Sequence, residues 1–275
     1  MDIKRVISQR KSIRTYRNEI ISIELREKLE NYIADVASPF ESKMRFVLLD
    51  TDDMSSQTKL GTYGVISGAK TFICGITEKA YRYEENLGFA FEKIILYATS
   101  LGLGTCWLGG TFNRSNFAKA VGLKENEIIP VVTPVGYAKE KRNFLDSLFV
   151  KSAGSVNRKD WSELFFDEGF GKPLKRDAED RFAEVFDMVR IAPSARNKQP
   201  WRIVKNGGMF HFHLCRALGY KETLGYDIQR LDIGIAMCHF EIMIQELGLE
   251  GKWINNDPGL ILEKNIEYII TYTTE

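Results

Sequence analysis

The stretch APSARNKQPW, residues 192–201, separates two ordered segments of the chain. It contains two prolines and no regular spacing of apolar residues, so it is a poor helix and a poor central strand. The residues before it, 177–191, have the apolar spacing of a helix, and residues 201–205 have the composition of a strand. The stretch is therefore a loop, and it is either a plain turn or a binding surface held on a rigid scaffold.

Elements of the same kinds are expected in the same order on both sides of the middle of the chain. In the first part we expect a helix over 20–36, strands over 45–50 and 70–76, a buried helix over 87–101 and a strand over 131–137. In the second part we expect a helix over 177–191, strands over 201–205 and 209–214, a helix over 231–247 and a strand over 266–273.

The two parts also share residues. Residues 88–107 and 234–253, aligned without gaps, have six identities, including Gly102 with Gly248 and Trp107 with Trp253. Two generic buried helices would match in hydrophobicity but hardly in these residue types, so we favour internal duplication over coincidence. The predicted halves are residues 1–155 and 156–275, and they would most simply pack about a pseudo-two-fold axis.

The composition excludes some classes of protein. The chain has 38 basic and 37 acidic residues, a formal net charge of +1, which argues against a protein that binds nucleic acid or a membrane surface. Its four cysteines are far apart and form no CxxC pair, the N-terminus lacks the apolar region of a signal peptide, and no apolar run is long enough to span a membrane. We expect a cytoplasmic protein.

Two basic clusters could hold an anion. The RKSIR segment offers two guanidinium groups and a hydroxyl, from Arg10, Ser12 and Arg14, and this combination suits a phosphate. Lys139, Lys141 and Arg142 follow an expected strand. Taken alone, each cluster is more commonly explained as solvated surface charge.

Two loops carry groups that could contact a ligand. Gly109 and Gly110 would let the backbone lie flat against a planar ligand, although a flexible turn explains them equally well. Ser194, Asn197 and Gln199 give the 192–201 loop a hydroxyl and two amides.

Together these motifs resemble the FMN-dependent nitroreductase family: RKSIR near the N-terminus, a long helix running into SLGLGTCWLGG, a Gly-Tyr strand followed by Lys and Arg, and PSARNKQPW between a helix and a strand. The resemblance implies an α+β fold with mainly antiparallel sheets flanked by helices. In that family two subunits intertwine and FMN lies at their interface, so the two halves of this chain would form a pseudo-dimer.

The resemblance also implies roles for individual residues. The RKSIR motif would hold the FMN phosphate, and Arg14 would lie toward N1 and O2 of the ring, where a cation favours the anionic reduced flavin. The backbone of the two glycines would meet N5 and O4, and the 192–201 loop would close the site from the far side. The assigned residues are Arg10, Lys11, Ser12, Arg14, Tyr63, Gly109, Gly110, Lys141, Arg142, Pro193, Ser194, Ala195, Asn197 and Gln199.

Each half lacks the motif that the other carries. Residues 37–43, ASPFESK, stand where the first half should have PSxxN, and residues 165–169, FFDEG, stand where the second half should have a basic motif. The two surviving motifs belong to the same site of an intertwined dimer. We therefore predict one complete site per chain, which binds one FMN.

The predicted activity is hydride transfer by bound FMN from NAD(P)H to a small acceptor such as a nitroaromatic or a quinone. The chain shows no nucleophilic catalytic constellation, but the flavin would carry the chemistry. A non-catalytic FMN-binding or storage protein, and a relative specialised for dehalogenation or ring oxidation, are the alternatives. No metal is predicted, because His211 and His213 share a strand face without a third ligand. A monomer is expected, with further self-association left open.

Overall fold

The computed structural model describes residues 2–51, 60–139, 157–218 and 224–274, and it divides into two compact units. The first unit contains Gln9–Ala153, and the second contains Gly154–Glu275 together with Asp2–Ser8. The N-terminal helix α1 (Ile3–Gln9) thus packs almost entirely with the second unit, although the sequence analysis placed it in the first half. Its apolar side chains Ile3, Val6 and Ile7 are buried, and Lys4 forms an ion pair with Glu184.

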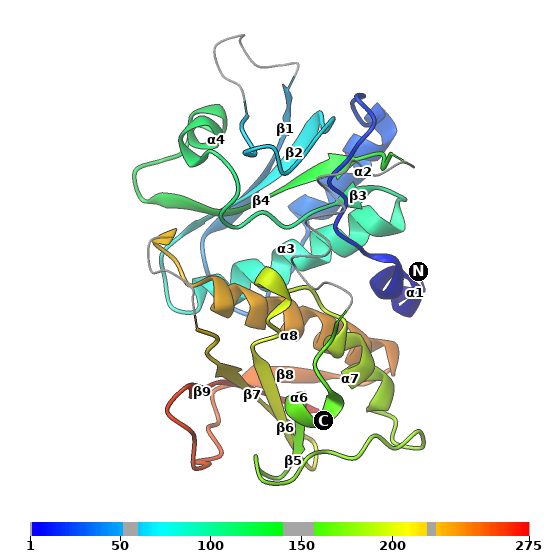
Figure 1. The fold of residues 1–275 in the computed structure, drawn as a ribbon, viewed down its shortest axis with the longest axis vertical. Coiled ribbons are helices and arrows are strands. Elements are labelled where there is room, and N and C mark those ends of the chain that lie inside the picture. Colours follow the sequence, from blue (N-terminus) through cyan, green and yellow to red (C-terminus); the bar gives the residue numbers. More distant parts are fainter. Residues whose placement is uncertain (1, 52–59, 140–156, 219–223, 275) are drawn as a thin grey trace. The chain divides into compact units, whose positions relative to one another are not determined.

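The first unit is a four-stranded antiparallel sheet in the order β1-β2-β4-β3 (Figure 1). The strands are β1 (Met44–Asp50), β2 (Thr71–Glu78), β3 (Gly104–Thr105) and β4 (Glu127–Gly136), and the helices are α2 (Ile23–Ala34), α3 (Tyr83–Ser100) and α4 (Arg114–Ala120). The helix α3 packs against β2, whose residues are nearly all buried. Local sequence sets the helix starts, since Ser22 and Asn113 accept hydrogen bonds from the first turns of α2 and α4.

The second unit is a five-stranded sheet in the order β5-β6-β7-β9-β8 (Figure 1). Its strands are β5 (Phe165–Asp167), β6 (Trp201–Asn206), β7 (Met209–Cys215), β8 (Gly251–Ile254) and β9 (Ile266–Thr274), and only the β5–β6 pair is parallel. Its other helices are α6 (Trp161–Leu164), α7 (Ala183–Arg190), the short 3-10 helix η2 (Ala195–Asn197) and α8 (Ile228–Glu246). The expected α+β class with mainly antiparallel sheets is confirmed.

The two units share a strand order. The first has β1-β2-β4-β3 and the second has β6-β7-β9-β8, so strands in corresponding chain positions occupy corresponding places in the sheets. In both units the long helix, α3 or α8, lies between the second and third of these strands in sequence.

Aromatic residues dominate the core of the second unit. The Phe240 ring on α8 lies within 4.8–6.3 Å, between centroids, of rings from α7, β7, β8 and β9. These partners are Phe186, Phe210, Phe212, Trp253 and Tyr272. Phe240 is fully buried, and it therefore joins the helical layer to the sheet.

Within the described ranges, none of the helices has the length and apolar character needed to cross a membrane.

Candidate functional site

The RKSIR segment runs along the edge of the first unit's sheet. Ser12 forms a parallel bridge with Thr105 of β3, and the Ile13 amide donates to the Thr105 carbonyl at 2.8 Å. Gly104 makes this approach possible, because a Cβ there would lie 2.8 Å from the Ile13 side chain.

The residues that follow tie the segment to two other predicted parts of the site. The Ser67 amide donates to the Arg14 carbonyl at 2.9 Å, and the Lys139 amide donates to the Thr15 carbonyl at 3.0 Å. The basic motif, the loop that contains Tyr63 and the end of β4 are therefore neighbours, although they are far apart in sequence. Tyr63 is 68% exposed, and Lys141 and Arg142 lie outside the described residues.

Arg10 has a buried side chain next to a buried carboxylate. Its side chain is 7% exposed, and its Nε lies 3.9 Å from Oε1 of the fully buried Glu92. The Trp107 indole donates to the other oxygen of Glu92 at 2.7 Å. Arg10 Nη1 is buried and has no hydrogen-bond partner in the part of the chain that the structure describes. A buried charged donor without an acceptor is costly, so this atom fits an anionic ligand such as a phosphate.

The glycine loop follows β3 and is held by the sheet. Leu108 exchanges two backbone hydrogen bonds with Val132 of β4, both 3.0 Å long. Arg114 donates from Nη2 to the Gly109 carbonyl at 2.7 Å. Gly110, the next residue, is exposed.

The 192–201 loop of the second unit is built around Arg158, which sequence reasoning missed. Arg158 donates to the carbonyls of Ile191 and Ala192 and to Asn197 Oδ1, each at 2.8 Å. The Gln199 side chain is buried; it accepts from the Lys159 amide at 2.9 Å and donates to the Asn197 carbonyl at 2.9 Å. The amides of Asn197 and Gln199 therefore shape the loop itself, and their contact with FMN stays a prediction.

The loop has an unusual backbone that needs this support. Arg196, Asn197 and Gln199 all have positive φ angles, of 49°, 54° and 46°, which non-glycine residues adopt only when the surroundings enforce them. Asp232 of α8 supplies a further anchor by accepting the Ala195 amide at 3.0 Å. Burial raises the pKa of the Asp232 carboxyl well above its usual range, against the opposing effect of the Ala195 hydrogen bond.

Arg158→Ala should loosen this loop without unfolding the unit. Removing the guanidinium takes the side-chain donor from the carbonyls of Ile191 and Ala192, and it removes one of the hydrogen bonds that hold the Asn197 side chain. We expect hydrogen exchange of residues 193–199 to accelerate at least about tenfold, as loss of ~1.4 kcal/mol of local stability implies. Lys159→Ala, which removes the pairing of a half-buried side chain with Glu163, is the control; equal exchange in both variants would contradict the role of Arg158.

The two histidines of β7 lie on one face of the sheet and are both buried. His211 Nδ1 lies 2.7 Å from Thr271 Oγ1, and His213 Nδ1 lies 3.1 Å from the His211 carbonyl. Both Nε2 atoms are buried without a partner among the residues that the structure places. In the same described ranges no group of three His, Cys, Asp or Glu residues could hold a metal ion.

This pair should make the protein less stable in mild acid. Burial lowers the pKa of His213 to about 4 and also lowers that of His211, against smaller opposing effects that include the charge of Asp257. The unfolded chain binds protons below about pH 6.5 while folded His213 does not, so stability falls from pH 6.5 toward 4, with a slope approaching ~1.4 kcal/mol per pH unit for one histidine. His213→Gln should flatten the pH dependence of unfolding in urea; an unchanged slope would contradict this reading.

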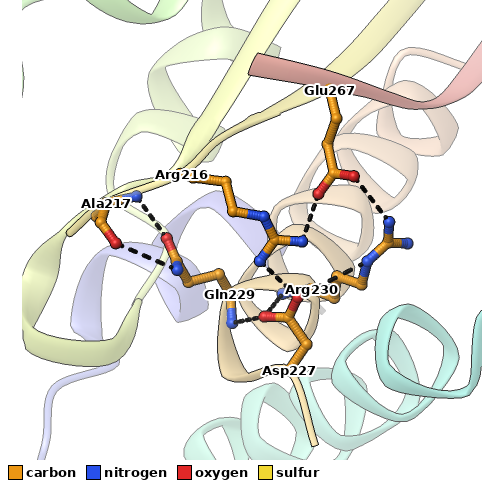
Figure 2. A network of polar contacts seen from close by, with 6 residues as sticks. All are labelled: Arg216, Ala217, Asp227, Gln229, Arg230 and Glu267. Carbon is orange, nitrogen blue, oxygen red and sulfur yellow. Dashed lines mark hydrogen bonds and ion pairs between the residues drawn. The ribbon is translucent and has the colours of Figure 1, made fainter. Parts of the chain in front are cut away.

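A network of ion pairs and hydrogen bonds lies at the N-terminus of α8 (Figure 2). Arg216 pairs with Asp227 at 2.6 Å and with Glu267 of β9 at 2.5 Å, and Arg230 reaches Glu267 at 3.2 Å. Asp227 also accepts the first amides of α8, and Gln229 exchanges hydrogen bonds with the Ala217 backbone. Two arginines face two carboxylates, so the network balances its own charge and joins β7, α8 and β9.

Comparison with known proteins gives a consistent result. A family model described as "Putative TM nitroreductase" matches residues 2–244. A curated relative, the "Putative NADH dehydrogenase/NAD(P)H nitroreductase" of Archaeoglobus fulgidus, is 26% identical over 170 residues, covering 57% of this chain and 97% of the relative.

Solved structures show the same likeness. A Thermotoga maritima structure described as a "putative nitroreductase" is 20% identical, has a TM-score of 0.62, and is covered to 93% by the whole of this chain, which establishes the fold. A Bacteroides fragilis nitroreductase with bound FMN is 21% identical with a TM-score of 0.41, covering 52% of this chain and 92% of that one.

Proposed function

The chain belongs to the nitroreductase family whose model matches residues 2–244, and from this we propose that it is an FMN-dependent oxidoreductase that passes a hydride from NAD(P)H to a small acceptor. The observation that carries the proposal is the buried Arg10 guanidinium, whose Nη1 has no acceptor in the described parts of the chain. It lies in the segment that the family resemblance assigns to the FMN phosphate.

The surrounding residues fit the cofactor. Arg10 and Ser12 would bind the phosphate, and Arg14 would lie toward the ring, as the order of the motif implies. The backbone of Gly109 and Gly110 would meet the ring edge. Bound FMN would itself supply the hydride chemistry, so the protein needs only to bind the cofactor, orient it and exclude water.

We further propose that the two units arose by duplication. Their shared strand order supports this, and so does one pair of contacts. Asn86 of α3 exchanges hydrogen bonds with the Phe40 backbone at 2.9 and 2.8 Å, while Asp232 of α8 accepts from the Ala195 amide. Both helix residues lie two positions before the start of the gapless alignment and are related by its offset, and each holds the loop that follows the preceding helix of its own unit.

One FMN per chain follows from the distribution of motifs. Only the first half carries the basic RKSIR motif, and only the second carries PSARNKQPW. We propose that these motifs serve a single FMN in a pseudo-dimeric chain that acts as a monomer. Four free cysteines are consistent with a reducing cytoplasm, where we place the protein.

Titration of FMN-free protein, followed by flavin fluorescence and absorbance, tests these proposals. The expected result is saturation at one FMN per chain, with a bound flavin spectrum. No binding would overturn the cofactor assignment, and two equivalent sites would overturn the single-site proposal. Steady-state NAD(P)H oxidation with a quinone or a nitroaromatic then tests the enzyme assignment: a flavin-loaded protein that oxidises neither NADH nor NADPH would be a binding protein and not an oxidoreductase.

A further inference from the structure

The glycine loop of the first unit is fixed on both sides. Before it, Leu108 is held by its two hydrogen bonds to Val132. After it, the Asn113 amide donates to the Gly61 carbonyl at 2.8 Å, and the Asn113 side chain caps α4. Between these two anchors, Gly109 and Gly110 have the widest range of allowed backbone angles, because they carry no side chain.

Arg114 restrains that peptide from the first turn of α4. Its Nη2 donates to the Gly109 carbonyl at 2.7 Å, and its Nε donates to the Ile129 carbonyl at 3.3 Å. Its guanidinium carbon lies 4.9 Å from the centroid of the buried Phe112 ring. The planar guanidinium therefore links the glycine loop to β4 through hydrogen bonds from two of its nitrogens. A lysine side chain has a single nitrogen and could not make both hydrogen bonds with this geometry.

The hydrogen bond from Arg114 to the Gly109 carbonyl also orients the Gly110 N–H, which belongs to the same peptide. In a planar trans peptide the carbonyl and the following N–H point in opposite directions, so the Gly110 N–H points away from Arg114. Gly110 is exposed, and its N–H makes no hydrogen bond within the described parts of the chain. We propose that Arg114 is a positioning residue that holds the Gly110 N–H as a hydrogen-bond donor toward the isoalloxazine ring, an inference that rests on the proposed binding of FMN.

NMR of protein labelled with ¹⁵N-glycine tests the inference in the full chain. The Gly110 amide signal is recorded without FMN and with saturating FMN, for the wild type, Arg114→Ala and Arg114→Lys, and the dissociation constant of FMN is measured for each. Arg45→Ala is the matched control. Arg45 also contacts carbonyls of this region, those of Val121 and Gly122 at 3.4 and 3.5 Å, but at the other end of α4.

The wild type should give one sharp Gly110 signal that shifts when FMN binds. Arg114→Ala should move or broaden that signal before FMN is added, abolish most of the FMN-induced shift, and weaken FMN binding about three- to tenfold, as expected for one hydrogen bond. Arg114→Lys should retain part of the shift. Arg45→Ala should leave the Gly110 signal and the FMN affinity within twofold of the wild type.

The outcomes separate this inference from the proposed function. An Arg114→Ala spectrum that matches the wild type without FMN would overturn the role of Arg114, whatever FMN does. If Arg45→Ala changes the Gly110 amide signal as much as Arg114→Ala does, Arg114 only supports α4 and does not position the Gly110 N–H. A wild-type protein that binds no FMN would overturn the proposed function, and the flavin part of this inference with it.

Discussion

Arg10→Ala should weaken FMN binding by about one to two orders of magnitude. The Arg10 guanidinium is buried, and its Nη1 lacks an acceptor within the described residues, so a phosphate bound there would gain charge-assisted hydrogen bonds worth about 1.5–3 kcal/mol each. Each 1.4 kcal/mol corresponds to about tenfold in affinity. Fluorescence titration of FMN-free protein measures the loss of affinity. Arg10→Lys keeps the positive charge but loses the bidentate guanidinium, so it should show part of that loss.

Arg17→Ala provides the control for this measurement. Arg17 lies in the same N-terminal segment, but its side chain is 58% exposed and pairs with the exposed Glu19, so its loss should leave FMN affinity nearly unchanged. Removing Arg10 also leaves the buried Glu92 carboxylate without its nearby cation, which can destabilise the unit. Glu92→Gln combined with Arg10→Ala removes that charge. If both Arg10 variants fold and bind FMN within twofold of the wild type, the phosphate assignment is wrong.

Phe240→Ala should have the largest effect on stability. The fully buried ring joins α8 to four other elements of the second unit, and truncation would lose its buried area and leave a cavity among other aromatic rings. Phe-to-Ala changes at such sites cost about 3–5 kcal/mol. Urea unfolding followed by tryptophan fluorescence measures the loss; Trp253, whose ring lies 6.3 Å from that of Phe240, is one of the chain's four reporters.

Two further variants calibrate this prediction. Phe240→Leu keeps most of the side-chain volume and should cost less than about half as much as Phe240→Ala. Leu218→Ala, at a side chain that is 95% exposed, should change stability by no more than about 0.5 kcal/mol. A Phe240→Ala variant within 1 kcal/mol of the wild type would show that the aromatic cluster repacks freely.

The long elements could be predicted from the sequence because burial imposes a regular pattern on them. The helix expected over 231–247 is α8 (Ile228–Glu246), and the strand expected over 209–214 is β7 (Met209–Cys215). The short elements had no such pattern. The two-residue strand β3 forms by pairing with Val135 and Gly136 of β4, and the helix α1 buries its apolar residues with the second unit; both depend on distant residues.

In the candidate site, too, the sequence predicted some residues and missed others. Motifs pointed to the residues of RKSIR, the glycine pair and the 192–201 loop, and the structure brings RKSIR next to the Tyr63 loop and the end of β4. The residues that hold these segments, Arg158, Glu92 and Arg114, were missed because each acts through a tertiary contact with no sequence spacing of its own. Asp232 did carry a signal, since a carboxylate inside an apolar helix needs a partner.

Because Asp2–Ser8 pack with the second unit, one cut in the chain does not separate the two units. Within the described residues, the polypeptide passes from one unit to the other between Ser8 and Gln9 and again between residues 139 and 157, so the compact units do not coincide with the two halves of the sequence. Expressing residues 154–275 alone would omit the helix whose Ile3, Val6 and Ile7 are buried and would expose the apolar surface that they cover. A chain arranged in this way cannot be cut at its middle without loss of stability in the second unit.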